Sequence, residues 1–90
     1  MTSPQPERYS ILLVEDDRDQ VRYVRTMLGA ENSIVGEIRV AGTVTDGLAL
    51  IGERIPDCIL LDLNLPDSDG LDTFRTVNRK APDLPIIIFS

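Results

Sequence analysis

Three unbroken apolar runs most narrow the folds open to this chain. They are Ile-Leu-Leu-Val at 11–14, Cys-Ile-Leu-Leu at 58–61 and Ile-Ile-Ile-Phe at 86–89. A short apolar run without polar alternation is typical of a strand buried on both faces, as in a parallel sheet covered by helices. The runs therefore predict strands at 9–14, 58–62 and 86–89 in the interior of one domain.

Helical patterns separate these strands. Apolar residues recur at helical spacing over 18–28, 44–55 and 71–80, and Thr43 is suited to cap the second helix. The segment 38–40 alternates apolar with charged residues, as an edge strand does. The alternating order predicts an α/β fold with a parallel sheet and helices on both faces, over 9–90, after a flexible arm at 1–8.

Polar side chains follow three of the predicted strands. Glu15, Asp16 and Asp17 follow the first, Asp62 ends the next, and Ser90 follows the last. Ligands of open parallel sheets bind beyond the carboxyl ends of the strands, so these groups are expected to converge. Clustered carboxylates repel each other unless a cation intervenes, and Mg²⁺ prefers oxygen ligands. The pattern predicts a Mg²⁺ site where a carboxylate attacks phosphorus and Ser90 bonds a phosphoryl oxygen.

Each feature taken alone also has an ordinary structural explanation. The acidic triplet Glu15-Asp16-Asp17 could simply cap the helix that begins after it, and Asp62 could be a turn residue. Ser90 alone could be structural, and Cys58, inside an apolar run, is expected to be a small buried hydrophobe. The functional interpretation rests on the three strand ends lying side by side.

Composition excludes several other classes of function. Histidine is absent, which rules out Ser-His-Asp catalysis, histidine metal sites and a phosphohistidine donor within this sequence. The formal charge of −6 argues against nucleic-acid binding by this segment. No apolar run approaches the ~18 residues of a membrane helix, so no membrane contact and a cytoplasmic location are expected.

The motifs resemble those of a known family. Ile-Leu-Leu-Val-Glu-Asp-Asp at 11–17 and Asp-Leu-Asn-Leu-Pro-Asp-Ser-Asp-Gly-Leu at 62–71 are similar to the receiver domain of two-component response regulators. The stretches 41–50 and 85–90 are similar to that family's second strand-to-helix turn and fourth strand. The resemblance implies a flavodoxin-like (CheY-like) doubly wound parallel sheet with strand order 2-1-3-4-5.

The resemblance also implies roles for individual residues. Asp62 matches the phosphorylated aspartate, Asp16 the acid that binds Mg²⁺ directly, and Glu15 the acid that acts through water. Asn64 would lend its backbone carbonyl to the metal, and its side chain would tune the lifetime of the phosphoryl group. Ser90 matches the switch hydroxyl. Asp17 would only cap the helix, and Pro66 and Gly70 would shape the loop.

The implied function is phosphorelay signalling. A sensor histidine kinase or a phosphotransfer protein would phosphorylate Asp62, and the chain would be a phosphoacceptor rather than an enzyme, at most catalysing its own phosphorylation and dephosphorylation. A phosphatase with an aspartate nucleophile is disfavoured, because such enzymes place a second aspartate where this chain has Asn64. No nucleotide-binding glycine-rich loop is present.

One departure from the family pattern leaves an alternative open. The family has a fifth strand ending in a lysine, whereas the only lysine here, Lys80, lies at the end of the third predicted helix. We therefore expect a sheet that lacks the family's last strand and flanking helices, slow or absent phosphorylation, and self-association through the exposed strand 86–89 or exchanged segments. The alternative function is a non-catalytic interaction or oligomerisation module that is not phosphorylated.

Overall fold

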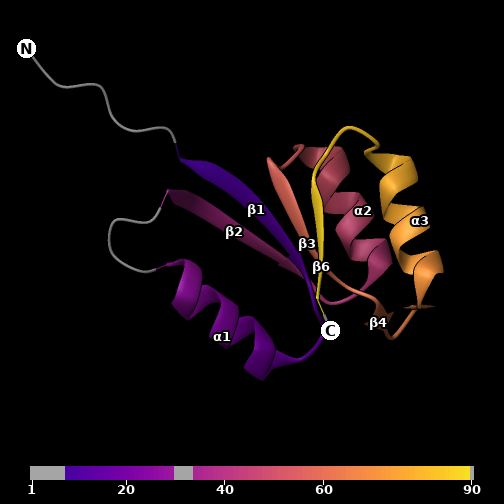
Figure 1. Cartoon of the computed structure of the whole chain (residues 1–90), viewed down its shortest axis with the longest axis horizontal. Helices are drawn as coiled ribbons and strands as arrows, with labels where there is room; N and C mark the ends of the chain where they lie inside the picture. The colour runs from indigo at the N-terminus through magenta and orange to yellow at the C-terminus, as the bar shows by residue number, and fades with distance from the viewer. Residues whose placement is uncertain (1–7, 30–33, 90) are drawn as a thin grey trace, which may run out of the picture.

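A parallel sheet forms the centre of the molecule. The computed structural model describes residues 8–29 and 34–89. Within them, the main sheet has four parallel strands in the order β2-β1-β3-β6 (Figure 1). They are β1 (Tyr9–Val14), β2 (Val35–Ala41), β3 (Cys58–Asp62) and β6 (Ile86–Phe89). The three apolar runs form β1, β3 and β6 as predicted, and the order is that of the first four strands of the receiver fold.

Helices cover both faces of the sheet. α1 (Arg18–Leu28) lies on one face, and α2 (Val44–Glu53) and α3 (Leu71–Lys80) lie on the other (Figure 1). The chain moves outward from β1 to β2 and then back across to β3. Two right-handed crossovers in opposite directions place α1 and α2 on opposite faces, which is the predicted doubly wound arrangement. Among the described residues, no helix has the length and apolar character needed to cross a bilayer.

The two faces are packed unequally. Beneath α2 and α3 lies a continuous core made of Leu12, Val14, Ala41, Val44, Ile51, Ile59, Leu61, Leu65, Val77 and Ala81. Strand alternation points Ile11 and Leu13 to the α1 face, where both are buried. No residue of α1 itself is buried, however, and its predicted stripe of Val21, Val24 and Leu28 is only half-buried. Hydrophobic stabilisation is therefore concentrated on the α2 and α3 side.

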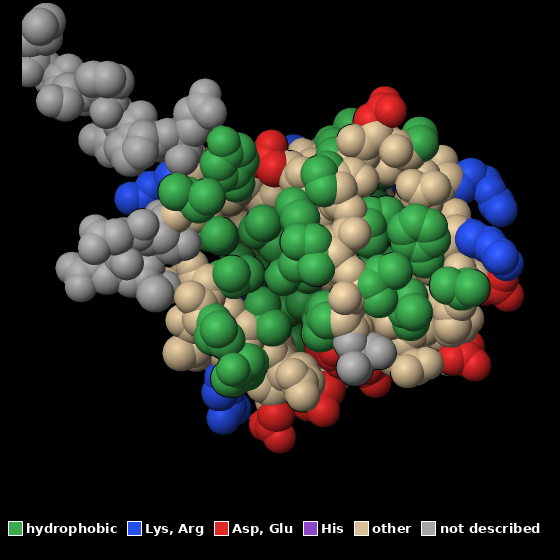
Figure 2. Space-filling view, in the orientation of Figure 1, with side chains coloured by type: hydrophobic (Ala, Val, Ile, Leu, Met, Phe, Trp, Pro, Cys, Tyr) green, Lys and Arg blue, Asp and Glu red, His purple; other side chains and the backbone are tan. Residues whose placement is uncertain are grey.

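The outer edge of β6 is apolar and open. β6 pairs with β3 on one side, and no strand among the described residues pairs with its other side. Ile87 and Ile88 are 54% and 44% exposed. Figure 2 shows hydrophobic side chains gathered over this part of the molecule. The predicted exposed edge strand is thus present.

Two predicted boundaries are wrong. The second helix was expected to run to residue 55, but α2 ends at Glu53 and Ile55 is 67% exposed. Arg54 is extended with φ −161°, and Ile55 precedes a proline, which disfavours the helical backbone. The segment 38–40 is also only the centre of the longer β2.

The expected loop over 64–69 is a small hairpin. β4 (Asn64–Leu65) pairs antiparallel with β5 (Ser68–Asp69), and Pro66-Asp67 forms the turn. Proline presets the backbone for the first central position of such a turn. Gly70 then leads into α3 with φ 62°, a left-handed value that favours glycine. Pro66 and Gly70 shape this segment as the resemblance implied.

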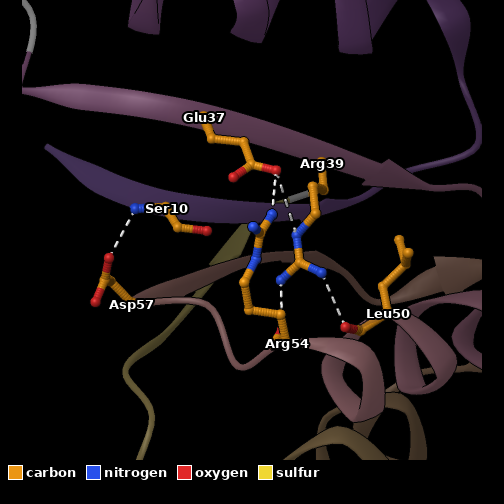
Figure 3. Close-up of polar contacts among 6 residues, drawn as sticks. All are labelled: Ser10, Glu37, Arg39, Leu50, Arg54 and Asp57. Atoms are coloured by element: carbon orange, nitrogen blue, oxygen red, sulfur yellow. Dashed lines mark hydrogen bonds and ion pairs between the residues drawn. The ribbon is translucent and has the colours of Figure 1, made fainter.

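A polar network closes the end of the molecule where the strands begin. Arg39 of β2 donates to the carbonyl oxygens of Leu50 at 2.9 Å and Arg54 at 2.5 Å (Figure 3). These carbonyls lie at the C-terminal end of α2, where a positive charge is favourable, and the Leu50 carbonyl also accepts from the N–H of Arg54 at 3.1 Å. Glu37 pairs with Arg54 and lies 4.0 Å from Nε of Arg39. The network ties β2 to the end of α2.

Candidate metal and phosphoacceptor site

The opposite edge of the sheet gathers the predicted acids. Val14 is in register with Leu61, and Asp62 is in register with Phe89, so β1, β3 and β6 end together. Glu15 and Asp16 continue directly from β1, beside Asp62 at the end of β3. Oxygens of these three carboxylates all lie within 4.8 Å of one another. The convergence predicted from the strand ends is therefore present in the structure.

These carboxylates fit a hard divalent cation. Glu15 and Asp62 are 4% and 8% exposed, whereas Asp16 is exposed to solvent. Three carboxylates so close, two of them buried, repel each other unless a proton or a cation is shared. Mg²⁺ takes oxygen ligands, retains several waters, and needs only one or two carboxylates from the protein. The donor set and the open side of the cleft match that requirement.

The pKa of Glu15 reflects its burial beside the other carboxylates. Burial raises the pKa of Glu15 to about 7, and the carboxylates of Asp62 and Asp16 push it in the same direction. The backbone N–H of Asp17, which donates to Oε1 of Glu15 at 2.9 Å, opposes this rise. Without a cation, Glu15 therefore keeps its proton to a higher pH than an ordinary glutamate does.

The backbone fixes the two acids that follow β1. The N–H of Glu15 donates to the carbonyl of Ala41 at 2.8 Å, which extends the β1–β2 pairing by one residue. Asp17 accepts from the N–H groups of Asp19 and Gln20 and so caps α1. The capping role expected for Asp17 is confirmed. The start of α1 thereby holds Glu15 and Asp16 at the rim of the cleft.

Asp62 is oriented by the residue two positions on. The N–H of Asn64 donates to Oδ1 of Asp62 at 3.0 Å. Asp62 and Asn64 both line an open cleft of about 540 Å³. The Asn64 backbone thus lies next to the Asp62 carboxylate, where the resemblance implied a metal-binding carbonyl.

The cleft also contains residues that were not predicted to line it. Its lining is Glu15, Asp16, Asp17, Gln20, Asp62, Asn64 and Phe89. Gln20 lies in the first turn of α1, three residues after the cap, so its closeness to the acids could have been read from the helix start. Phe89 could have been found as the last residue of an apolar run that ends beside Asp62. Ser90 lies outside the described residues, and Lys80 is not part of this lining.

Comparisons with known proteins agree with this geometry. The model of the response regulator receiver domain matches residues 11–90. The regulatory protein LuxO of Vibrio cholerae is 46% identical over 54 residues, which is 60% of this chain and 12% of LuxO. KdpE, the KDP operon transcriptional regulatory protein of Escherichia coli, is 38% identical over 81 residues, 90% of this chain and 34% of KdpE.

A solved structure has the same architecture. The MaeR response regulator bound to beryllium trifluoride superposes with a TM-score of 0.80 at 27% identity, covering 90% of this chain and 66% of that one. The chain therefore spans about an eighth to a third of the two curated relatives' length and about two thirds of the structural neighbour.

Proposed function

This chain belongs to the response regulator receiver family, and from that premise we propose that it accepts a phosphoryl group on Asp62. The donor would be a sensor histidine kinase or a phosphotransfer protein. The observation that carries the proposal is the buried Asp62 carboxylate within 4.8 Å of the oxygens of Glu15 and Asp16. Receiver domains are signalling domains, and the chain would at most accelerate its own phosphorylation and dephosphorylation.

The reaction is an in-line phosphoryl transfer. A carboxylate oxygen of Asp62 forms a bond to phosphorus while the bond from phosphorus to the donor's imidazole nitrogen breaks. The imidazole leaves with that electron pair and takes up a proton, and Asp62 becomes an acyl phosphate. The hydrogen bond from Asn64 N–H holds the carboxylate in one orientation for this attack.

Mg²⁺ is the cofactor that the site would hold. Asp16 and Asp62 would bind it directly, Asn64 through its backbone carbonyl, and Glu15 through water. When bound, the ion would neutralise charge on the transferring phosphoryl group. Ser90 would bond a phosphoryl oxygen, and the Asn64 side chain, exposed in the cleft, would influence access of hydrolytic water. The MaeR response regulator, which is similar to this chain, is bound to beryllium trifluoride, and that supports a ligand site in this fold.

Phosphorylation by a small donor tests the proposal. Incubation with acetyl phosphate and Mg²⁺ is expected to add the mass of one phosphoryl group slowly, because no lysine is among the described residues that line the cleft, and EDTA should prevent the addition. Asp62→Asn should remove the addition, whereas Asp83→Asn, an exposed acid in the α3–β6 loop, should retain it. Retention of the full mass shift in Asp62→Asn would refute the assignment.

The proposal includes a cytoplasmic location, where ATP supplies histidine kinases.

A second candidate function is a self-associating interaction module. The exposed Ile87 and Ile88 on the open edge of β6 favour it, because an exposed apolar edge strand can pair with another chain. Ile87→Lys should shift the protein toward monomer in analytical ultracentrifugation, whereas Ile55→Lys, at an exposed apolar residue away from β6, should not. A wild-type monomer at micromolar concentration would exclude this candidate. A protein of this kind need not bind Mg²⁺, so the Mg²⁺ affinity separates the two functions.

A further inference from the structure

The segment that follows Asp62 is a compact hairpin rather than a loose loop. Asn64 pairs with Asp69 and Leu65 pairs with Ser68, and only Pro66 and Asp67 form the turn. Asn64 stands at the base of the hairpin, next to the cleft, and Asp67 stands at its tip. Only Leu65, whose backbone is paired, and Pro66, whose φ is fixed by its ring, separate Asp67 from Asn64, so a displacement of the tip is expected to move Asn64.

Asp67 fastens the tip to the start of α2. Its Oδ1 accepts from the N–H of Val44 at 2.9 Å, and its Oδ2 accepts from the N–H of Thr45 at 3.0 Å and the Thr45 hydroxyl at 2.9 Å. Donation by the Thr45 and Val44 N–H groups lowers the pKa of Asp67. Thr43 takes the next N–H of the helix, that of Asp46, at 3.0 Å. α2 is thus capped by two side chains, and only Asp67 comes from the hairpin.

Thr73 fastens the base of the hairpin from the other side. Its side chain is fully buried, and its hydroxyl lies 2.9 Å from the carbonyl oxygen of Leu63 and 2.8 Å from Oγ of Ser68. The same Leu63 carbonyl accepts from the N–H of Gly70 at 3.0 Å. Leu63 joins Asp62 to Asn64, so this contact fixes the backbone between the acceptor and the proposed metal-binding carbonyl.

We propose that Asp67 is a positioning residue for the phosphoacceptor site, and that Thr73 is its counterpart at the base of the hairpin. Together they hold the hairpin so that the Asn64 carbonyl and the Asp62 carboxylate are already placed for Mg²⁺. The role of Asp67 rests on the proposed function, because positioning matters only if the cleft takes a metal and a phosphoryl group. A site whose ligands are held in advance by outer contacts binds its metal more tightly.

Three variants of the intact chain test the role of Asp67. Asp67→Ala removes both hydrogen bonds to the α2 backbone, and Asp67→Asn retains one carbonyl oxygen that can accept one of them. Thr43→Ala is the matched control, because it also removes a cap from α2 but leaves the hairpin attached. Comparable thermal midpoints for Asp67→Ala and Thr43→Ala would show that both lose a similar amount of helix capping.

The Mg²⁺ affinity, measured by calorimetric titration, is the main readout. Asp67→Ala should weaken binding about tenfold and Asp67→Asn about threefold, toward the low end of effects known for outer contacts of metal sites. Thr43→Ala should bind as wild type does. A purely structural role for Asp67 predicts equal affinities in Asp67→Ala and Thr43→Ala, and that result would overturn the proposal.

Hydrogen exchange separates this proposal from the proposed function. In the metal-free protein, Asp67→Ala should speed exchange of the Asn64 and Gly70 amides several-fold over Thr43→Ala, whether or not the wild type binds Mg²⁺ or is phosphorylated. If exchange is faster in Asp67→Ala but the wild-type protein takes no phosphoryl group, Asp67 holds the hairpin in place and the proposed phosphotransfer is rejected. Unchanged exchange would reject the role of Asp67, even if Asp62 is phosphorylated normally.

Discussion

The two ends of the sheet treat charge in opposite ways. Where the strands end, Glu15, Asp16 and Asp62 bring three carboxylates together, and none of the described residues that line the cleft is basic. Where the strands begin, Arg39 and Arg54 meet Glu37 and the last carbonyls of α2. Under the proposed function, the first end takes its balancing cation from outside, whereas the second pairs its charges within the chain. Substitutions should therefore lower ligand binding at one end and stability at the other.

Removal of Asp16, the exposed one of the proposed metal ligands, should have the largest effect. Asp16→Asn removes one charged oxygen donor from a site that has few, so Mg²⁺ affinity should fall about 100-fold, or roughly 2.7 kcal/mol. Stability of the metal-free protein should stay the same or rise slightly, because one repelling charge is lost. Calorimetric titration and thermal unfolding in EDTA measure the two quantities. A loss of stability without a loss of Mg²⁺ affinity would contradict the expected difference between the two ends of the sheet.

The opposite end should respond in the reverse manner. Arg39→Met keeps much of the side-chain volume but leaves the carbonyls of Leu50 and Arg54 without their charged donor. Hydrogen bonds to charged groups are worth about 1.5–3 kcal/mol, so the free energy of unfolding should fall by about 2 kcal/mol. Mg²⁺ affinity should be unchanged. Denaturant unfolding provides the measurement, and a tenfold change in Mg²⁺ affinity would show that the two ends are coupled.

The raised pKa of Glu15 predicts how pH should act on the stability of the metal-free protein. Its folded pKa of about 7 lies above its usual value of 4.5, so the folded state holds this proton more tightly. This contribution to stability is present below about pH 4.5 and is lost as pH rises through 7. Glu15→Gln should flatten that slope and stabilise the metal-free protein by about 1 kcal/mol at pH 8. Thermal unfolding between pH 5 and 8 tests it; a wild-type slope in Glu15→Gln would contradict the assignment.

Mg²⁺ should reverse this dependence on pH. The ion binds the ionised carboxylates, so its stabilising effect should grow from pH 6 to pH 8 as Glu15 loses its proton. The increase in unfolding temperature on adding Mg²⁺, measured at both pH values in wild type and Glu15→Gln, gives the comparison. An equal increase at both pH values in the wild type would mean that Glu15 is not part of the metal site.

The smallest effect is expected at the exposed ion pair between Glu37 and Arg54, at the end of the sheet where the strands begin. Glu37 and Arg54 have side chains 43% and 60% exposed, and such pairs contribute between about 0 and 1 kcal/mol. Glu37→Gln should therefore change the free energy of unfolding by less than about 1 kcal/mol, with no change in Mg²⁺ affinity. A loss as large as that of Arg39→Met would show that Glu37, rather than the helix carbonyls, holds Arg39 in place.

The features that could be predicted from the sequence are those that depend on residues adjacent in the chain. Apolar runs identified β1, β3 and β6, and the acids placed after them met at one edge because parallel strands all end on the same side. The family assigned from the two acidic motifs is confirmed. An apolar run and the residues that flank it determine structure locally, so a single sequence was sufficient to predict these strands and the acids at their ends.

The features that were missed depend on partners far along the chain. Asp67 reads as a turn residue, yet its partners Val44 and Thr45 are more than twenty positions away, and nothing near Asp67 specifies them. The open packing of α1 follows from what covers its face, which its own apolar stripe does not reveal. The role predicted for Ser90 stays a prediction, since that residue lies outside the described ranges.

The central claim is that Asp62 is the residue that takes the phosphoryl group, in the cleft it shares with Glu15 and Asp16. Reduction of the phosphorylated protein with borohydride converts an aspartyl phosphate to homoserine, which tandem mass spectrometry can locate in the sequence. We expect homoserine at position 62, and only in samples that contained both donor and Mg²⁺. Homoserine at another aspartate, or its formation at position 62 in the presence of EDTA, would contradict it.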